Sequence, residues 1–315
     1  MSTSNKPVVL GMFPLAPAAR KAFDERYTLY LTNPSEVEGM ASDSPMAEAE
    51  MVITNGVVGL SRASMGKLPR LRLAASYGVG YEGIDTAAAR ERGVVVANGP
   101  GGNSETVADH AVGLMLALAR GYLQSDGAIR SGKWEQHARP TLWAARLGIV
   151  GMGNVGRGIA RRAEGFQMKI SYHTPSPKND LPYRHCGSIE QLAAESDFLV
   201  LACSGGAATR KLVDAAVLRA LGQAGFGFLV NVSRGSVVDT DALVRALADG
   251  LIGGAGLDVF DHEPDVPPAL LAQPNVIVTP HMAGRSPAAT KLMVDMMMAN
   301  VDAVRDGKPV PYAVA

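Results

Sequence analysis

The stretch LGIVGMGNVG at residues 147–156 decides the fold. A short apolar run leads into Gly151, Gly153 and Gly156, and a helix-like stretch follows at 157–164. In such a G-x-G-x-x-G pattern the first glycine permits a tight turn, the second lets the backbone approach a pyrophosphate, and the third allows close helix–strand packing. The amide groups at the helix N-terminus then face the phosphates. This strand–turn–helix context favours a dinucleotide site over a plain structural turn.

Outward from this stretch, short apolar runs alternate with longer amphipathic stretches, which predicts parallel sheets covered by helices. Strands are expected at 8–12, 51–54, 71–76 and 94–97, and again at 147–150, 169–173, 198–203, 228–232, 254–259 and 276–279. A long helix is expected from Ser104 to Gly121, and a Met-rich helix at 288–306 that packs a core or a subunit contact. At 315 residues the chain is long enough for two domains.

Composition excludes several classes of protein. Lys plus Arg and Asp plus Glu both number 30, so the net charge is zero and neither nucleic acid nor an anionic membrane is an expected partner. The apolar patch at 7–12 is too short for a signal peptide or a membrane span. Cys186 and Cys203 make no disulfide framework, so we expect a reducing cytoplasm. No metal site is expected.

Polar side chains follow three of the predicted strands in the second half of the chain. Arg234 comes just after the run at 228–232, Glu263 lies beyond the run at 254–259, and His281 follows the run at 276–279. Because the carboxyl ends of neighbouring parallel strands meet at one edge of a sheet, we expect these side chains to converge.

These three residue types suit hydride transfer to a 2-keto acid. A planar guanidinium binds a carboxylate in a fork geometry and polarises a keto oxygen. A histidine supplies the proton that the developing alkoxide needs, and a carboxylate beside it favours the imidazolium and orients it. Taken singly, an arginine or a histidine after a strand is usually a surface charge or a structural residue. Their conjunction with a dinucleotide site favours the catalytic interpretation.

The strand after the glycine-rich turn ends in HTPSPK at residues 173–178, without an acidic residue. An NAD-specific site usually places Asp or Glu here, and that acid would repel a 2′-phosphate. His173, Thr174, Ser176 and Lys178 are therefore candidates to hold the phosphate of NADP. The arginine expected of a strong NADP site is missing, and Ser176 and Lys178 are equally compatible with an ordinary solvated loop. The sequence favours NADP and leaves NAD possible.

Together the motifs resemble those of the D-isomer-specific 2-hydroxyacid dehydrogenase family over essentially the whole chain. The matching stretches are SYGVGYEGID at 76–85, TVADH at 106–110, the glycine-rich turn, NVSRGSVVD at 231–239, GLDVF at 256–260 and TPH at 279–281. The resemblance implies catalytic roles for Arg234, Glu263 and His281, and substrate binding by Arg234 and the backbone of Val79 and Gly80. The candidate cofactor residues, with Asp258 bonding the nicotinamide carboxamide, are Thr106, Gly151, Gly153, Asn154, Val155, Gly156, His173, Thr174, Ser176, Lys178, Cys203, Val232 and Asp258.

The resemblance also implies an architecture and an assembly. It implies an α/β fold of two doubly wound parallel-sheet domains, with a flavodoxin-like substrate domain at 1–99 and 287–315 and a Rossmann dinucleotide-binding domain at 100–286. It implies a homodimer, in which Trp143 is either a pocket wall from the partner subunit or an ordinary packing residue. The segment YGVGY at 77–81 and the acid-free strand are most similar to glyoxylate/hydroxypyruvate reductases, although Pro175 stands where such reductases often carry an arginine.

Three functions stay open at this point. The first is reduction of a small 2-keto acid of the glyoxylate or hydroxypyruvate type to the D-2-hydroxy acid with NAD(P)H. The second is a dehydrogenase for lactate-type or aryl pyruvates, because a methylene in a pocket changes specificity by only about 1–3 kcal/mol. The third is a nicotinamide-sensing binding protein resembling corepressors, in which the cofactor switches assembly instead of reacting.

Overall fold

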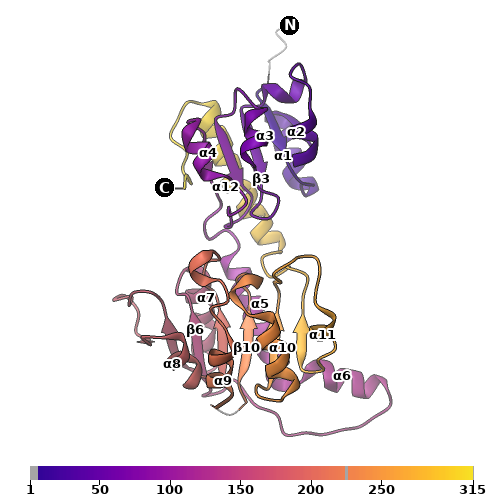
Figure 1. Cartoon of the computed structure of the whole chain (residues 1–315), viewed down its shortest axis with the longest axis vertical. Helices are drawn as coiled ribbons and strands as arrows, with labels where there is room; N and C mark the ends of the chain where they lie inside the picture. The colour runs from indigo at the N-terminus through magenta and orange to yellow at the C-terminus, as the bar shows by residue number, and fades with distance from the viewer. Residues whose placement is uncertain (1–5, 224–225, 315) are drawn as a thin grey trace. The chain divides into compact units, whose positions relative to one another are not determined.

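The computed structural model describes residues 6–223 and 226–314, which form two compact units (Figure 1). The first unit comprises Met1–Asn103 and Arg285–Ala315, and the second comprises Ser104–Gly284. The functional roles expected for the two domains, substrate binding and cofactor binding, stay predictions.

A parallel sheet of five strands organises the described part of the first unit, in the order β2-β1-β3-β4-β5. This is the flavodoxin-like strand order of a doubly wound sheet. Its strands are β1 (Val8–Gly11), β2 (Thr28–Leu31), β3 (Met51–Thr54), β4 (Leu73–Ser76) and β5 (Val95–Ala97). Its helices are α1 (Pro17–Arg26), α2 (Pro34–Gly39), the 3-10 turn η1 (Pro45–Glu48), α3 (Arg62–Gly66), α4 (Thr86–Glu91) and α12 (Pro287–Arg305).

Both faces of the central strands β1, β3 and β4 are buried, which explains why these strands read as nearly continuous apolar runs. Successive residues alternate between two clusters: Leu10 and Val52 pack on one face, and Val9 and Met51 pack on the other. Helix α12 covers the second face with Met297 and its neighbours. The expectation that the Met-rich helix packs a core is confirmed, since the buried methionines of α12 are Met293, Met296, Met297 and Met298.

The second unit holds a seven-stranded parallel sheet in its described residues, ordered β12-β11-β10-β9-β6-β7-β8. Counted from β6, this is the Rossmann order with one further strand at the β12 edge. Its strands are β6 (Arg146–Val150), β7 (Lys169–His173), β8 (Arg184–His185), β9 (Phe198–Leu201), β10 (Phe228–Asn231), β11 (Gly254–Leu257) and β12 (Val276–Val278). Its helices and 3-10 turns are α5 (Ser104–Arg120), α6 (Tyr122–Arg130), α7 (Asn154–Glu164), α8 (Ile189–Ala194), η2 (Ala207–Thr209), α9 (Ala215–Gln223), η3 (Gly235–Val237), α10 (Thr240–Ala248) and α11 (Pro268–Leu271).

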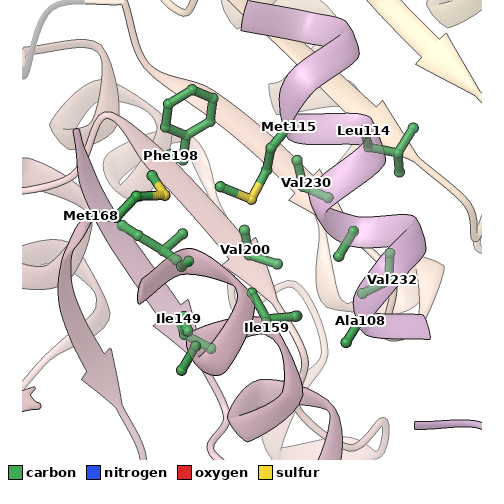
Figure 2. Packing of buried hydrophobic residues seen from close by; sticks show 14 of the residues in the cluster. Ala108, Leu114, Met115, Ile149, Ile159, Met168, Phe198, Val200, Val230 and Val232 are labelled. Atoms are coloured by element: carbon green, nitrogen blue, oxygen red, sulfur yellow. The ribbon is translucent and has the colours of Figure 1, made fainter. Parts of the chain in front are cut away.

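Two apolar clusters sandwich this sheet. On one face, Met115 of α5 and Ile159 of α7 pack with Ile149, Val200 and the other buried side chains that Figure 2 shows. The alternate residues of the same strands enter the second cluster, with helices α8, α9 and α10. The predicted fold class, two doubly wound parallel-sheet domains, is confirmed. Among the described residues, no helix combines the length and apolar character that crossing a bilayer requires.

Two strands were missing from the sequence expectations. Both lie at sheet edges, where β2 is only partly buried and β8 is the dipeptide Arg184–His185. Neither carries the run of buried apolar residues on which the prediction depended. The expected helix after the glycine-rich turn begins earlier than predicted, at Asn154 rather than at Arg157.

Candidate active site

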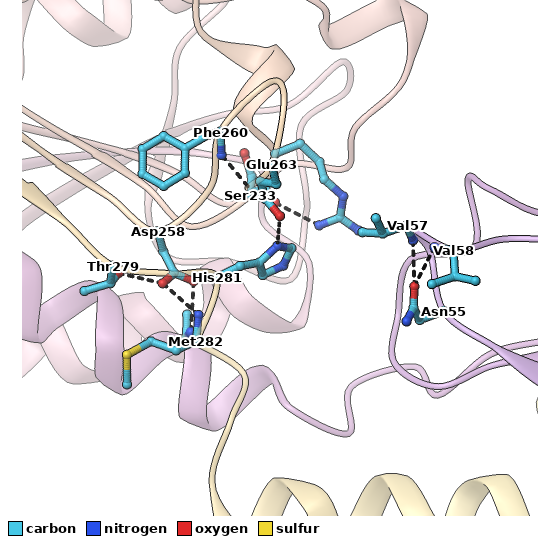
Figure 3. A network of polar contacts seen from close by, with 12 residues as sticks. Asn55, Val57, Val58, Ser233, Asp258, Phe260, Glu263, Thr279, His281 and Met282 are labelled. Carbon is cyan, nitrogen blue, oxygen red and sulfur yellow. Dashed lines mark hydrogen bonds and ion pairs between the residues drawn. The ribbon is translucent and has the colours of Figure 1, made fainter. Parts of the chain in front are cut away.

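His281 and Glu263 form a hydrogen-bonded pair in the second unit. The Nδ1 atom of His281 lies 2.7 Å from Oε2 of Glu263, and Oε1 of the same carboxylate accepts from the Phe260 amide at 3.1 Å (Figure 3). Because an ionised carboxylate only accepts hydrogen bonds, Nδ1 carries its proton and Nε2 is the ring atom that exchanges one. The His281 side chain is 43% exposed, so that second nitrogen is accessible to a ligand.

Asp258 anchors the loop that carries His281. Its backbone oxygen accepts from the His281 amide, and its two carboxylate oxygens accept from the amides of Met282 and Ala283, each at 2.9 Å. Figure 3 shows the bonds of this carboxylate to the loop. The residue is only 1% exposed, so these bonds replace the water that the carboxylate loses on burial.

Arg234 follows β10 and is positioned by its own strand end. Its Nη1 donates to the Ser233 carbonyl at 2.8 Å, and its carbonyl accepts from Asn231 Nδ2 at 2.9 Å. The aliphatic stem lies over Gly205, where an added Cβ would stand 2.7 Å from Cγ of Arg234. Since β10, β11 and β12 are neighbours in the sheet, Arg234, Glu263 and His281 follow three adjacent strand ends, as the sequence predicts.

Val79 and Gly80 lie in the first unit, in the loop after β4. The Val79 carbonyl accepts from Asn98 Nδ2 at 2.7 Å, and the Gly80 carbonyl accepts from the Ser76 hydroxyl. Because carbonyl and amide point in opposite directions across a trans peptide, fixing the Val79 carbonyl also fixes the direction of the Gly80 amide. The backbone for which the family resemblance implies substrate binding is therefore held in one orientation.

The glycine-rich turn has the geometry that a dinucleotide needs. Gly151 has φ +94°, and a Cβ added at Gly156 would lie 2.1 Å from the Gly151 carbonyl oxygen, so side chains are excluded at both positions. A Cβ added at Gly153 meets no atom within 4 Å, which leaves space beside the backbone. Helix α7 begins at the next residues, Asn154 and Val155, so its N-terminal amides border that space. These features fit a pyrophosphate.

The loop after β7 contains the candidate phosphate ligands. His173 Nδ1 lies 2.9 Å from the Cys186 carbonyl, so it carries a proton and the second protonation site is Nε2. The Thr174 hydroxyl donates to the Ser176 carbonyl at 2.6 Å and is buried, which commits its only proton within the loop. Ser176 and Lys178 have exposed side chains. Of the four candidates, Ser176 and Lys178 retain donors for an anion in this loop conformation, whereas the Nδ1 proton of His173 is committed to the Cys186 carbonyl.

The remaining candidate cofactor residues lie at the same edge of the second unit's sheet or at the start of α5. Cys203 follows β9 with a thiol whose pKa is raised by burial, and Val232 follows β10 as a buried side chain. Thr106 is half-buried in the first turn of α5. Trp143 is largely exposed and donates from Nε1 to Gln167 Oε1 at 3.2 Å. The cofactor roles of Cys203, Val232 and Thr106 stay predictions, as do both alternatives for Trp143, a pocket wall of the partner subunit or a packing residue.

Three further residues have contacts that the sequence reasoning did not anticipate. Thr279 donates to Asp258 Oδ1 at 2.6 Å, and His110 Nε2 lies 3.0 Å from the Thr279 hydroxyl. Arg157, in the first turn of α7, forms an ion pair with Asp180 at 2.9 Å. His110 and Thr279 both lie in stretches that carried the family resemblance, so their positions were visible in the sequence although their pairing was not.

Comparison with known proteins now places this geometry in a family. Residues 112–283 match the model of the NAD-binding domain of D-isomer-specific 2-hydroxyacid dehydrogenases. The hydroxyphenylpyruvate reductase of Plectranthus scutellarioides is 36% identical over 306 residues, which cover 96% of both chains. The glyoxylate/hydroxypyruvate reductase A of Arabidopsis thaliana is 35% identical over 303 residues, covering 95% of this chain and 96% of the relative.

A solved structure agrees over nearly the full length. The NADPH-dependent glyoxylate/hydroxypyruvate reductase of Sinorhizobium meliloti, in complex with NADP and malonate, superposes with a TM-score of 0.88 at 35% identity, covering 98% of this chain and 97% of the other. The family expected from the motifs is thus confirmed. The chain belongs to the D-isomer-specific 2-hydroxyacid dehydrogenases and is an NAD(P)-dependent oxidoreductase of that family.

Proposed function

We propose that this protein reduces glyoxylate and hydroxypyruvate to the corresponding 2-hydroxy acids, of D configuration where the product is chiral, with NADPH as the preferred donor. The observation that carries the proposal is the His281–Glu263 hydrogen bond at 2.7 Å, next to the strand end that holds Arg234. The Arabidopsis and Sinorhizobium relatives are named for these two substrates, which supports the substrate class.

The chain's residues divide the chemistry among them. The bound nicotinamide supplies the hydride that adds to the keto carbon. Arg234 binds the substrate carboxylate and polarises the keto oxygen. His281 delivers the Nε2 proton to that oxygen, so the hydride and the proton together yield the hydroxyl group. Glu263 accepts the Nδ1–H hydrogen bond throughout, which keeps the ring oriented with Nε2 toward the substrate oxygen.

The preference for NADPH rests on the loop after β7. No carboxylate follows His173 at the strand end where an NAD-specific site carries one. The exposed Lys178 supplies a donor there, and Arg157 of the adjacent α7 reaches the same loop through Asp180. This arrangement replaces the single arginine, whose place Pro175 takes, by two cationic groups, Lys178 and Arg157. NADH remains usable because the loop places no group that rejects a 2′-hydroxyl.

The protein further acts as a homodimer in a reducing, cytoplasmic compartment. Helix α6, all of whose residues the structure describes, buries none of its side chains. Tyr122, Leu123 and Ile129 are exposed on it, and Trp134 beyond it is 81% exposed. An apolar surface of this kind marks a protein interface. Cys186 and Cys203 are free thiols, which suits the compartment.

The test is a matrix of both reduced cofactors against a panel of 2-keto acids, with chiral analysis of the chiral products. The proposal expects the highest kcat/KM for NADPH with glyoxylate or hydroxypyruvate, and D-glycerate from the latter. A preference for aryl pyruvates would replace the substrate assignment, and the relative from Plectranthus is named for such a substrate. Tight cofactor binding with no turnover on any keto acid would instead favour a nicotinamide-sensing protein.

A further inference from the structure

The backbone of His281 adopts a conformation that is uncommon for residues other than glycine. Its φ is +49°, in the left-handed region that favours glycine and, less often, asparagine. A non-glycine residue stays in this region only where the surrounding structure holds it there. The contacts that hold the loop at residues 279–283 therefore bear directly on where the His281 ring lies.

Asp258 supplies those contacts, and Thr279 is a further hydrogen-bond donor to its carboxylate. The Asp258 backbone accepts from His281, and its carboxylate accepts from two loop amides and from the Thr279 hydroxyl at 2.6 Å. All these partners of the carboxylate are donors, so both oxygens of Asp258 act as acceptors. The loop that carries His281 thus donates hydrogen bonds to both the backbone oxygen and the carboxylate of one buried residue, Asp258.

The direction of these hydrogen bonds extends the network to α5. A hydroxyl has a single proton, and the Thr279 hydroxyl donates it to Asp258. The Thr279 oxygen must therefore accept from His110 Nε2 at 3.0 Å, which fixes the proton of His110 on Nε2. The same nitrogen lies 3.6 Å from Asp258 Oδ1, and the His110 side chain is 20% exposed. His110 thereby orients the Thr279 hydroxyl toward the carboxylate.

Close packing of α5 against β11 brings His110 within hydrogen-bond distance of Thr279. A Cβ added at Gly256 of β11 would lie 3.1 Å from Cβ of Leu114, which is one helical turn beyond His110. Leu114 and Ala111 are buried, so the helix is held by the core rather than by His110 itself. Loss of the His110 ring should consequently disturb the polar network and leave the helix in place.

We propose that His110 is a positioning residue for His281, acting through the Thr279 hydroxyl and Asp258. The inference rests on the proposed role of His281 as proton donor. His110 contacts neither substrate nor hydride donor in this role, so it affects the rate of the chemical step and not the binding of ligands.

The experiment measures kcat and KM for hydroxypyruvate and NADPH in five test variants and one control variant of the full chain, with melting temperatures as a check on folding. His110→Ala should lower kcat by about three- to tenfold, the loss of one hydrogen bond, with both KM values within about twofold of the wild type. His110→Gln should restore most of kcat, because its amide presents a donor near the position of Nε2. Thr279→Val should lower kcat further, and Thr279→Ser should restore it.

The double variant H110A/T279V is the decisive member of this set. If His110 acts only through Thr279, the double variant should be no slower than Thr279→Val alone. Multiplied effects, or wild-type kcat in His110→Ala, would overturn the inference, as would a rise in KM with unchanged kcat. Asp109→Asn, at an exposed position on the same helix, is the matched control and should leave kcat unchanged.

The test is separable from that of the proposed function. If His281→Ala keeps full activity, the proposed function falls and takes this inference with it. If His281→Ala loses activity while His110→Ala and Thr279→Val keep theirs, only the inference about His110 falls. Should Thr279→Val fail to fold, the loss in His110→Ala and its rescue in His110→Gln decide the question alone.

Discussion

The Nδ1 atom of His281 lies 2.7 Å from Oε2 of Glu263, while the other oxygen of that carboxylate is fixed by the Phe260 amide at 3.1 Å. The carboxylate therefore cannot rotate without breaking a bond to its own loop. A ring bound to it keeps the same tautomer and the same direction for Nε2. This relationship connects the fold of the strand ends to the proposed chemistry.

Glu263→Gln should lower kcat by about 10- to 100-fold, because an amide can present a donor to Nδ1 where the carboxylate only accepts, so the tautomer and orientation of the ring are no longer fixed. Steady-state kinetics with NADPH and hydroxypyruvate measure the loss. Glu135→Gln is a matched control, since Glu135 also lies beside a histidine, His137, at 3.5 Å on an exposed surface. Equal activity in the two variants would contradict the role given to Glu263.

Gly205→Ala should lower kcat/KM for the keto acid by about tenfold without adding or removing a charge. The new Cβ would stand 2.7 Å from Cγ of Arg234, which is near the root of that side chain, so the guanidinium must move. A displacement of about 1 Å at a positioning group can cost about 100-fold in rate. Gly187→Ala, where the nearest atom is 4.0 Å away, serves as the control. Wild-type kinetics in Gly205→Ala would show that activity does not depend on the observed position of the Arg234 side chain.

His173→Asp should reverse the cofactor preference. A carboxylate at the end of β7 accepts from a ribose 2′-hydroxyl and repels a 2′-phosphate. The ratio of kcat/KM for NADPH over NADH should fall by about 100-fold, which corresponds to about 2.7 kcal/mol. Lys169→Asp, at the opposite end of the same strand, should leave the ratio near its wild-type value. An unchanged ratio in His173→Asp would move the phosphate site away from this loop.

The stability contributed by Asp239 should depend on pH. Asp239 is the N-cap of helix α10, and its carboxylate accepts a hydrogen bond from the Ala242 amide. This hydrogen bond, together with the nearby Lys211, holds the pKa of the Asp239 carboxyl below its usual value. A lowered folded-state pKa contributes stability that is present above the unfolded pKa and is lost as pH falls through the folded pKa. Asp239→Ala should cost about 1 kcal/mol at pH 7.

The stability lost in Asp239→Ala should become smaller as the pH falls. Thermal unfolding of both proteins at pH 7 and at about pH 3, which is below the ordinary Asp pKa of about 3.9, measures this change. Asp43→Ala, in an exposed turn, is the control and should change the melting temperature little at either pH. A difference between Asp239→Ala and the wild type that is the same at both pH values would contradict the assignment.

Much of this molecule was predictable because its strands are buried on both faces. Runs such as those around Ile149, Val200 and Val230 are almost continuously apolar, since alternate residues enter opposite clusters. The carboxyl ends of β10 and β12 then indicated where Arg234 and His281 lie. The edge strands β2 and β8 were missed because partial exposure removes that apolar signal.

The polar network behind the site was not predictable, because it depends on contacts between distant segments. His110 and Thr279 are 169 residues apart in the chain and meet only where α5 packs against the sheet. Likewise, the Thr174 hydroxyl looks available in the sequence, yet in the folded loop it donates to the Ser176 carbonyl. Tertiary geometry, rather than residue type, decides which donors remain for a ligand.

Single-turnover oxidation of bound NADPH by hydroxypyruvate in His281→Ala tests directly whether this histidine is the proton donor. The rate of this step should fall by about 100-fold or more, the usual contribution of a positioned acid. The dissociation constant for NADPH, followed by cofactor fluorescence, should stay within about twofold of the wild type. A wild-type rate in His281→Ala would contradict the central claim that this histidine supplies the proton.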